Sequence, residues 1–182
     1  MEPLDQSPEE AYSVWALPPE PVRGRLRRLM AGLCAVHGGP VFEPHVTVVG
    51  AVRLRRSAAI EALRAASAGV RPYTVRVTGG SGFYNRGCLV LEPTPEVISA
   101  SDHCCSHFGY QRSTSYKPHL SLTYGDRAEE REAALRKKVE ELDEDIRGLQ
   151  FEISELALYT TEPGDVESWQ LVEAYQLTTA EE

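Results

Sequence analysis

The chain has 182 residues, of which 42% are hydrophobic, and it carries a formal net charge of −8 at pH 7. This length suits one core or two tightly joined lobes, and the composition is that of a packed globule, not of a disordered chain. The acidic balance argues against a partner such as a long nucleic acid, which needs a basic surface. No apolar run approaches the roughly 20 residues of a membrane span, so we expect no membrane association.

The first ten residues are acidic and contain proline, so they lack the basic start and apolar stretch of a signal peptide. Four cysteines are present, with no C-x-x-C spacing, and two of them are adjacent at 104 and 105. Without a secretory signal this pattern predicts reduced thiols and a cytoplasmic protein.

The chain is predicted to form both strands and helices, and most of the strands are separated by a helix. In chain order, they are a strand over 12–17, a helix over 22–36, a strand over 44–49, a helix over 57–68, strands over 73–78 and 83–91, a helix over 95–108, a strand over 118–124, a helix over 128–142, and strands over 151–159 and 169–177. Ser57 is the expected N-cap of the second helix, and Thr94-Pro95 opens the third because proline suits the first helical position.

One short pattern occurs twice in this chain, and each copy follows a proline. The segment 45–48 reads His-Val-Thr-Val, and the segment 119–122 reads His-Leu-Ser-Leu. Side chains alternate between the two faces of a strand, so His45 and Thr47 share one face, as do His119 and Ser121. Two such strands can place two histidines and two hydroxyls around one anion.

A histidine pair can run phosphoester chemistry without a metal. One neutral imidazole takes a proton from water, and the other, as imidazolium, donates one to the leaving oxygen; a pKa near 6.5 suits both tasks. The hydroxyls of Thr47 and Ser121 can donate hydrogen bonds to phosphate oxygens as charge builds there. We assign His119 as base and His45 as acid, while the similarity of the motifs leaves the reverse assignment open.

With these motifs the chain resembles the 2H phosphoesterases, which two His-x-[Thr/Ser] motifs define, and within them the plant cyclic phosphodiesterase branch. Nearly the whole chain takes part in the resemblance. It includes Tyr12-Ser-Val-Trp-Ala-Leu-Pro18, Pro44-His-Val-Thr47, Thr94-Pro-Glu-Val97, His103-Cys104 with His107-Phe108, and Pro118-His-Leu-Ser-Leu122 with Tyr124.

The resemblance implies an α+β fold of two pseudo-symmetric lobes, each with antiparallel sheet and helices, and an active site in the cleft between them. It also implies metal-free hydrolysis of ADP-ribose 1″,2″-cyclic phosphate and nucleoside 2′,3′-cyclic phosphates. His45 and His119 would be catalytic, and Thr47, Ser121 and Tyr124 would bind substrate. The element order agrees, because a helix and two strand-like segments follow each histidine strand. We expect a single domain over 1–182, with residues 1–10 and 178–182 loosely held.

Two other functions stay open. One is an RNA-end-processing 2H phosphoesterase that acts on oligonucleotides, against which the acidic surface argues. The other is a non-catalytic module that binds cyclic or ADP-ribose phosphates, which would not need both histidines. We expect a monomer that takes a small cyclic phosphate and needs no cofactor.

The remaining polar clusters are weaker candidates. His103 and His107 have helical spacing, but no third ligand is evident, so we predict no metal site. Arg86 lies near a predicted strand end and could touch a second phosphate of the substrate. Tyr12 and Trp15 could stack on a base, although aromatic residues in strands are usually core.

Overall fold

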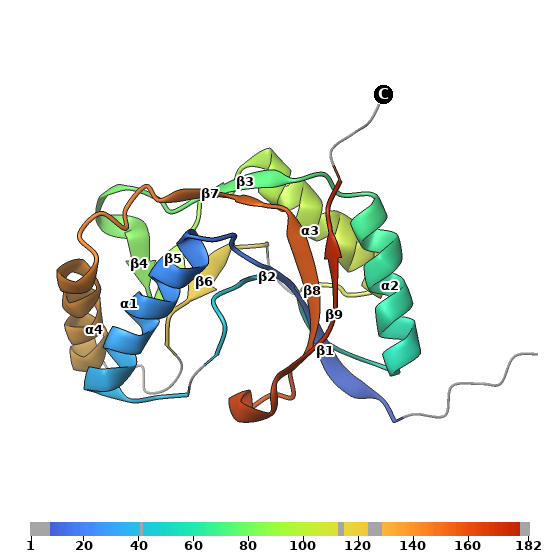
Figure 1. Ribbon diagram of the computed structural model, residues 1–182, viewed down its shortest axis with the longest axis horizontal. Coiled ribbons are helices and arrows are strands. Elements are labelled where there is room, and N and C mark those ends of the chain that lie inside the picture. The colour runs from blue at the N-terminus through green and yellow to red at the C-terminus, as the bar shows by residue number, and fades with distance from the viewer. Residues whose placement is uncertain (1–7, 41, 113–114, 124–128, 179–182) are drawn as a thin grey trace, which may run out of the picture.

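The computed structural model describes residues 8–40, 42–112, 115–123 and 129–178. It confirms the α+β class: antiparallel strands form the centre, and helices lie at both ends (Figure 1). The helices are α1 (Val22–His37), α2 (Arg56–Ala68), α3 (Pro95–Phe108) and α4 (Glu129–Leu142). The strands are β1 (Glu10–Ala16), β2 (Val46–Leu54), β3 (Tyr73–Arg76), β4 (Tyr84–Asn85), β5 (Cys88–Val90), β6 (His119–Ser121), β7 (Gln150–Ile153), β8 (Glu155–Thr160) and β9 (Gln170–Gln176).

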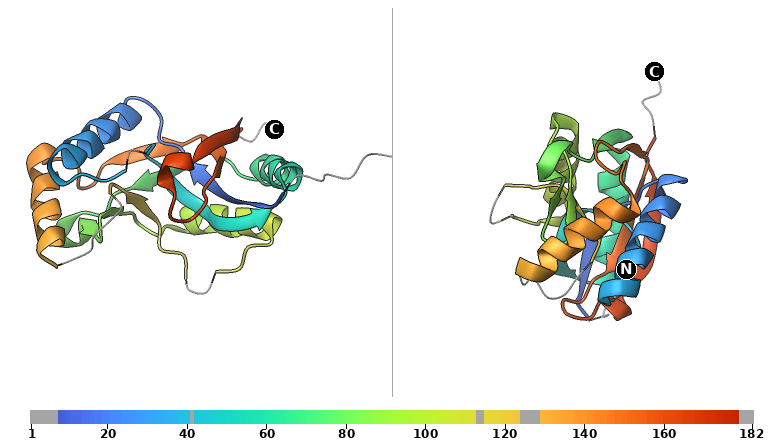
Figure 2. Two further views of the ribbon diagram at one scale, coloured as in Figure 1. Left: turned by 90° about the horizontal axis from the view of Figure 1, so that it is seen from below. Right: turned by 90° about the vertical axis from the view of Figure 1, so that its left-hand side faces the viewer.

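The two lobes share one sheet. Seven strands follow the order β4-β5-β6-β2-β1-β8-β9, and β3 pairs with β7 in a second, small sheet. The halves of the large sheet meet where β2 pairs with β6, through the single register pair Val46–Leu120. The helices α1 and α4 lie at the end that holds β4 to β6, and α2 and α3 at the other end (Figure 1, Figure 2).

One hydrophobic core runs through both halves of the protein. Buried side chains from each of the four helices belong to the same cluster, among them Leu26, Leu63, Val97 and Leu135. Leu120 and Val46, which join the two halves of the sheet, belong to this cluster too, so the junction packs against the same core. Because burial of apolar area is the main stabilising contribution, the lobes are expected to hold their relative position.

The predicted strand over 83–91 is wrong, because it is a hairpin of two short strands. Arg86 and Gly87 have φ values of 51° and 79°, and they turn the chain between β4 and β5. Two successive residues with positive φ are typical of a tight hairpin turn whose twist matches the strands. The strand over 151–159 also divides, since β7 pairs with β3 while β8 pairs with β1.

The two predicted helix starts have different outcomes. Thr94 caps α3 as expected: its hydroxyl accepts a hydrogen bond from the backbone N–H of Val97, and Pro95 begins the helix. Ser57 is not the N-cap of α2, because Arg55 takes that position in an extended conformation and the helix begins at Arg56. No helix in the described part of the chain is long and apolar enough to cross a membrane.

Candidate active site

The register of β2 and β6 brings the four motif side chains together. Val46 lies opposite Leu120, and both are buried in the core. In antiparallel pairing His45 then lies opposite Ser121, and Thr47 opposite His119, with all four on the other face of the sheet. Directly opposite residues have Cβ atoms about 5 Å apart. The two motifs therefore form one compact group at the centre of the large sheet.

Both imidazole rings are oriented in the same way. Nδ1 of His45 lies 2.7 Å from the carbonyl oxygen of Glu43, and Nδ1 of His119 lies 2.8 Å from that of Lys117. A carbonyl only accepts, so Nδ1 carries the proton in each ring. In the neutral form of each ring Nε2 then carries the lone pair, and the two copies of the motif repeat a contact to the second residue upstream.

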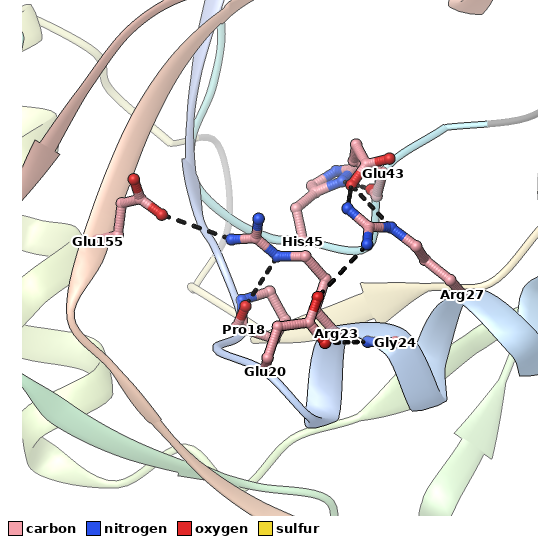
Figure 3. A network of polar contacts seen from close by, with 8 residues as sticks. All are labelled: Pro18, Glu20, Arg23, Gly24, Arg27, Glu43, His45 and Glu155. Carbon is pink, nitrogen blue, oxygen red and sulfur yellow. Dashed lines mark hydrogen bonds and ion pairs between the residues drawn. The ribbon is translucent and has the colours of Figure 1, made fainter.

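The residue that orients His45 is itself held by α1. The carboxylate of Glu43 accepts hydrogen bonds from Arg27 at 3.2 and 2.5 Å, and Arg27 also reaches Glu20 at 3.4 Å (Figure 3). The side chain of Glu20 accepts in turn from the backbone N–H of Gly24. This network connects the histidine to a rigid helix, and such outer contacts fix catalytic groups in place.

His45 is enclosed by aromatic side chains. Its ring stacks on Trp15, with centroids 3.4 Å apart and planes 4° from parallel, and Trp15 also stacks on Tyr159 at 3.9 Å. Trp15 lies opposite Thr47 in the β1–β2 register, so it faces the site and not the main core. Only 2% of His45 is exposed, and burial, with a smaller contribution from the nearby His119, lowers its pKa to about 3. His45 is therefore neutral at pH 7.

The low pKa of His45 should make the free energy of unfolding depend on pH. The unfolded chain binds a proton there near pH 6.5, the folded chain only near pH 3, so protonation favours unfolding between these values. The stabilisation present above about pH 6.5 is then lost as the pH falls towards 3, at about 1.4 kcal/mol per pH unit. We expect His45→Gln to flatten the dependence of the free energy of unfolding on pH in this window.

The measurement is denaturant unfolding at several pH values, compared between variants. Ser99→Ala is the control, because it changes an exposed position of α3 that carries no titratable group and should leave the slope unchanged. Equal slopes for the wild type and His45→Gln would contradict a neutral, buried His45.

Thr47 lies where β2 leaves β6. Between Val14 and Trp15 of β1, the register on β2 moves from Val49 to Thr47, which makes Val48 the extra residue of a β-bulge. Bulges are frequent beside active sites because they redirect a side chain. The carbonyl of Thr47 accepts a hydrogen bond of 2.7 Å from the hydroxyl of Tyr116.

The hydroxyls of Tyr116 and Ser101 donate hydrogen bonds to backbone carbonyls in this part of β2, where a neighbouring strand would otherwise do so. The hydroxyl of Ser101 donates to the carbonyl of Val48 at 2.6 Å, and burial raises the pKa of Tyr116, which keeps its phenol a donor at neutral pH. Arg112 lies over the ring of Tyr116, with 4.7 Å to the centroid. Tyr116 was not among the predicted site residues, although it lies only three residues before His119 in the chain.

Ser121 lies beside a thiol. It is 7% exposed, and its Oγ is 3.6 Å from Sγ of Cys88, which the β5–β6 register places directly opposite. His119 lies further along the same face, opposite Val90, and is exposed. One histidine of the site is thus buried and the other is open to solvent.

The other predicted residues have mixed outcomes. Tyr124 lies outside the described residues. Tyr12 is fully buried in the main core and Arg86 lines a cavity beside His119. The rings of His103 and His107 meet edge-on at 4.7 Å, and within the described residues no group of three His, Cys, Asp or Glu side chains could hold a metal ion.

Comparison with known proteins shows the family of this chain. Residues 18–165 match the model of the 2′-5′ RNA ligase superfamily. A relative named cyclic phosphodiesterase, from Arabidopsis thaliana, is 37% identical over 93% of this chain and 96% of its own length. A second, from Yarrowia lipolytica, is named 2′,3′-cyclic-nucleotide 3′-phosphodiesterase and is 25% identical over 88% of this chain and 96% of its own.

Solved structures show the same fold at low identity. Escherichia coli LigT, in a structure described as complexed with 3′-AMP, has a TM-score of 0.59 at 14% identity and covers 94% of this chain and 99% of its own. TT0787 of Thermus thermophilus has a TM-score of 0.58 at 16% identity, with 92% and 97% covered. Fold and paired motifs define a two-histidine phosphoesterase. The chain belongs to the 2′-5′ RNA ligase superfamily, the 2H phosphoesterases, and it is a phosphodiesterase.

Proposed function

We propose that this protein hydrolyses small cyclic phosphates, namely ADP-ribose 1″,2″-cyclic phosphate and nucleoside 2′,3′-cyclic phosphates, to monophosphates without a metal. The observation that supports the proposal most is the β2–β6 register. It sets two imidazoles and two hydroxyls on one face of the sheet, where they can contact a single phosphate. The names of the two relatives point to cyclic phosphodiesters as the substrate class.

The difference between the histidines suggests their roles. His45 is neutral at pH 7, so Nε2 can accept a proton from water, and the negative charge of a bound phosphate would stabilise the imidazolium that forms. His119 is exposed, so it can exchange protons with solvent and donate one through Nε2 to the leaving oxygen. The burial of His45 thus favours the reverse of our assignment from the sequence, with His45 as base and His119 as acid.

The proposed reaction is a single displacement at phosphorus. The water oxygen bonds to phosphorus, its proton passes to His45, and one ester bond of the ring breaks. The departing oxygen takes a proton from His119. The hydroxyls of Thr47 and Ser121 donate to the non-bridging oxygens, where charge is carried through the transition state. Trp15 excludes bulk water from His45, which strengthens local electrostatic interactions.

Turnover by the purified protein tests the proposal. We expect adenosine 2′,3′-cyclic phosphate and ADP-ribose 1″,2″-cyclic phosphate to be converted to monophosphates at equal rates with and without EDTA. An oligonucleotide that ends in a 2′,3′-cyclic phosphate is the comparison substrate. Loss of activity with EDTA and recovery with zinc would indicate a metallophosphatase. Turnover of the oligonucleotide alone would favour RNA-end processing, and binding without turnover a non-catalytic module.

A further inference from the structure

A cavity of about 420 Å³ opens beside His119. Its lining comes from β4, β5 and the turn between them, from the residues that follow β5, and from the start of β6 with the segment before it. None of the lining residues comes from β2. They are Asn85, Arg86, Cys88, Val90, Leu91, Pro93, Tyr116, Lys117, Pro118 and His119. We refer to this space as the β5 cavity.

The charge of the β5 cavity is opposite to that of the whole protein. Arg86 and Lys117 are both basic, and none of the described residues that line the cavity is Asp or Glu. The chain as a whole has 27 acidic against 19 basic residues. A cavity with one sign of charge raises the local concentration of oppositely charged ligands. In an acidic protein, this composition indicates an anion as the ligand.

The anion in this cavity differs from the reacting phosphate. The four motif residues belong to β2, its start and β6, whereas β5 lies on the far side of β6. Two strand spacings, roughly 10 Å, separate β5 from β2. His119 borders both spaces, so a substrate whose cyclic phosphate lies between the histidines can extend past His119 into the β5 cavity.

The two cations are attached to fixed parts of the site. Lys117 supplies the carbonyl that orients His119, and Arg86 lies in the hairpin turn whose next residue, Gly87, accepts a backbone hydrogen bond of 2.8 Å from Leu122. The backbone at both residues is therefore connected to β6. Arginine and lysine are the usual ligands of phosphate oxygens.

We propose that the β5 cavity binds a second, non-cyclic phosphate of the substrate, so that the preferred substrates carry a phosphate or diphosphate in addition to the cyclic one. This inference rests on the proposed function. The apolar side chains of Val90, Pro93 and Pro118 supply surface for the sugar that joins the two groups. The cavity thereby selects among cyclic phosphates and leaves the chemistry to the motif residues.

The test compares adenosine 2′,3′-cyclic phosphate with the same nucleotide bearing a 5′-phosphate. We expect the 5′-phosphate to lower KM in the wild type, and Arg86→Gln and Lys117→Gln each to remove about fivefold of this gain, as an exposed charge pair would. The KM of the unphosphorylated nucleotide should rise less than that of the 5′-phosphorylated nucleotide in each variant. Added salt should reduce the advantage of the 5′-phosphate, since exposed charges are screened. Lys137→Gln, which removes an exposed lysine of α4, is the matched control.

The outcomes separate the two proposals. If neither nucleotide is turned over, the proposed function fails, and calorimetry with inorganic diphosphate tests the cavity alone. There we expect at least tenfold weaker binding to the double variant of Arg86 and Lys117 than to the wild type or to Lys137→Gln. Equal KM for both nucleotides in the wild type, equal KM increases for both in the variants, or unchanged diphosphate binding would overturn the inference.

Discussion

We expect His45→Gln and His119→Gln each to lower kcat/KM for adenosine 2′,3′-cyclic phosphate by about 10²–10⁴-fold, the usual contribution of one general acid or base. Each variant removes one imidazole, and with it the Nε2 atom that would accept or donate a proton in the proposed reaction. Glutamine keeps a side chain of similar reach, so the surroundings of Trp15 and Glu43 should change little. Steady-state kinetics on the purified variants gives the two ratios.

The control is His107→Gln, an exposed histidine of α3 outside the motifs, which should retain wild-type activity. Circular dichroism and a thermal melt establish that the variants are folded, which matters for the buried His45. Near-wild-type kcat in either motif variant is incompatible with the two-histidine mechanism. An equal loss in His107→Gln would point instead to the helical histidine pair and to a metal.

The leaving group separates the acid from the base. A phosphodiester with a 4-nitrophenolate leaving group needs no proton on departure, so its hydrolysis depends on the base alone. We assign His119 as acid, and therefore expect His119→Gln to be far less impaired with this substrate than His45→Gln. The opposite order would restore the assignment first made from the sequence.

The sequence was sufficient to predict that the four motif residues lie together, because the information is local. Strand alternation alone places His45 with Thr47 and His119 with Ser121. The repeated pattern also predicted that the two motif strands bring their polar side chains together, and the pairing of β2 with β6 agrees with this. Helices α1, α2 and α3 also agree with the predictions to within a residue, because apolar spacing and terminal Gly or Pro residues mark them.

The unequal environments of the two histidines could not be predicted. The motifs are nearly identical, so nothing in them indicates that one ring is buried and the other exposed. The difference arises from Trp15, which reaches His45 through the β1–β2 pairing and its bulge at Val48. Pairing between distant segments determines which aromatic side chain covers which ring, and a single sequence does not encode that in any local pattern.

The division of the 83–91 strand has a similar origin. Apolar and aromatic residues at 83–84 and 88–91 flank only three other residues, which is why the segment was interpreted as one strand. The hairpin is decided by positive φ at both residues, which glycine tolerates but arginine seldom adopts. The sequence therefore placed Arg86 near the site but not at the turn that directs it to the β5 cavity.

The hydroxyl pair should contribute less than the histidines but still substantially. We expect Thr47→Ala and Ser121→Ala each to lower kcat by about 10²-fold, the cost of losing one donor to a phosphate oxygen in the transition state. Thr47→Val, which keeps the shape of the side chain but not the hydroxyl, should match Thr47→Ala, whereas Thr47→Ser should retain most activity. This comparison separates hydrogen bonding from packing in the bulged part of β2.

The double variant of Thr47 and Ser121 tests whether the two hydroxyls act on the same phosphate. Because both would stabilise one charge, the loss in the double variant should be smaller than the product of the single losses. Two donors that served separate groups would give multiplied losses, since distant and independent sites are additive in free energy. Wild-type kinetics in the double variant would remove both hydroxyls from the site. The β2–β6 register then would hold two histidines over a phosphate that neither Thr47 nor Ser121 contacts.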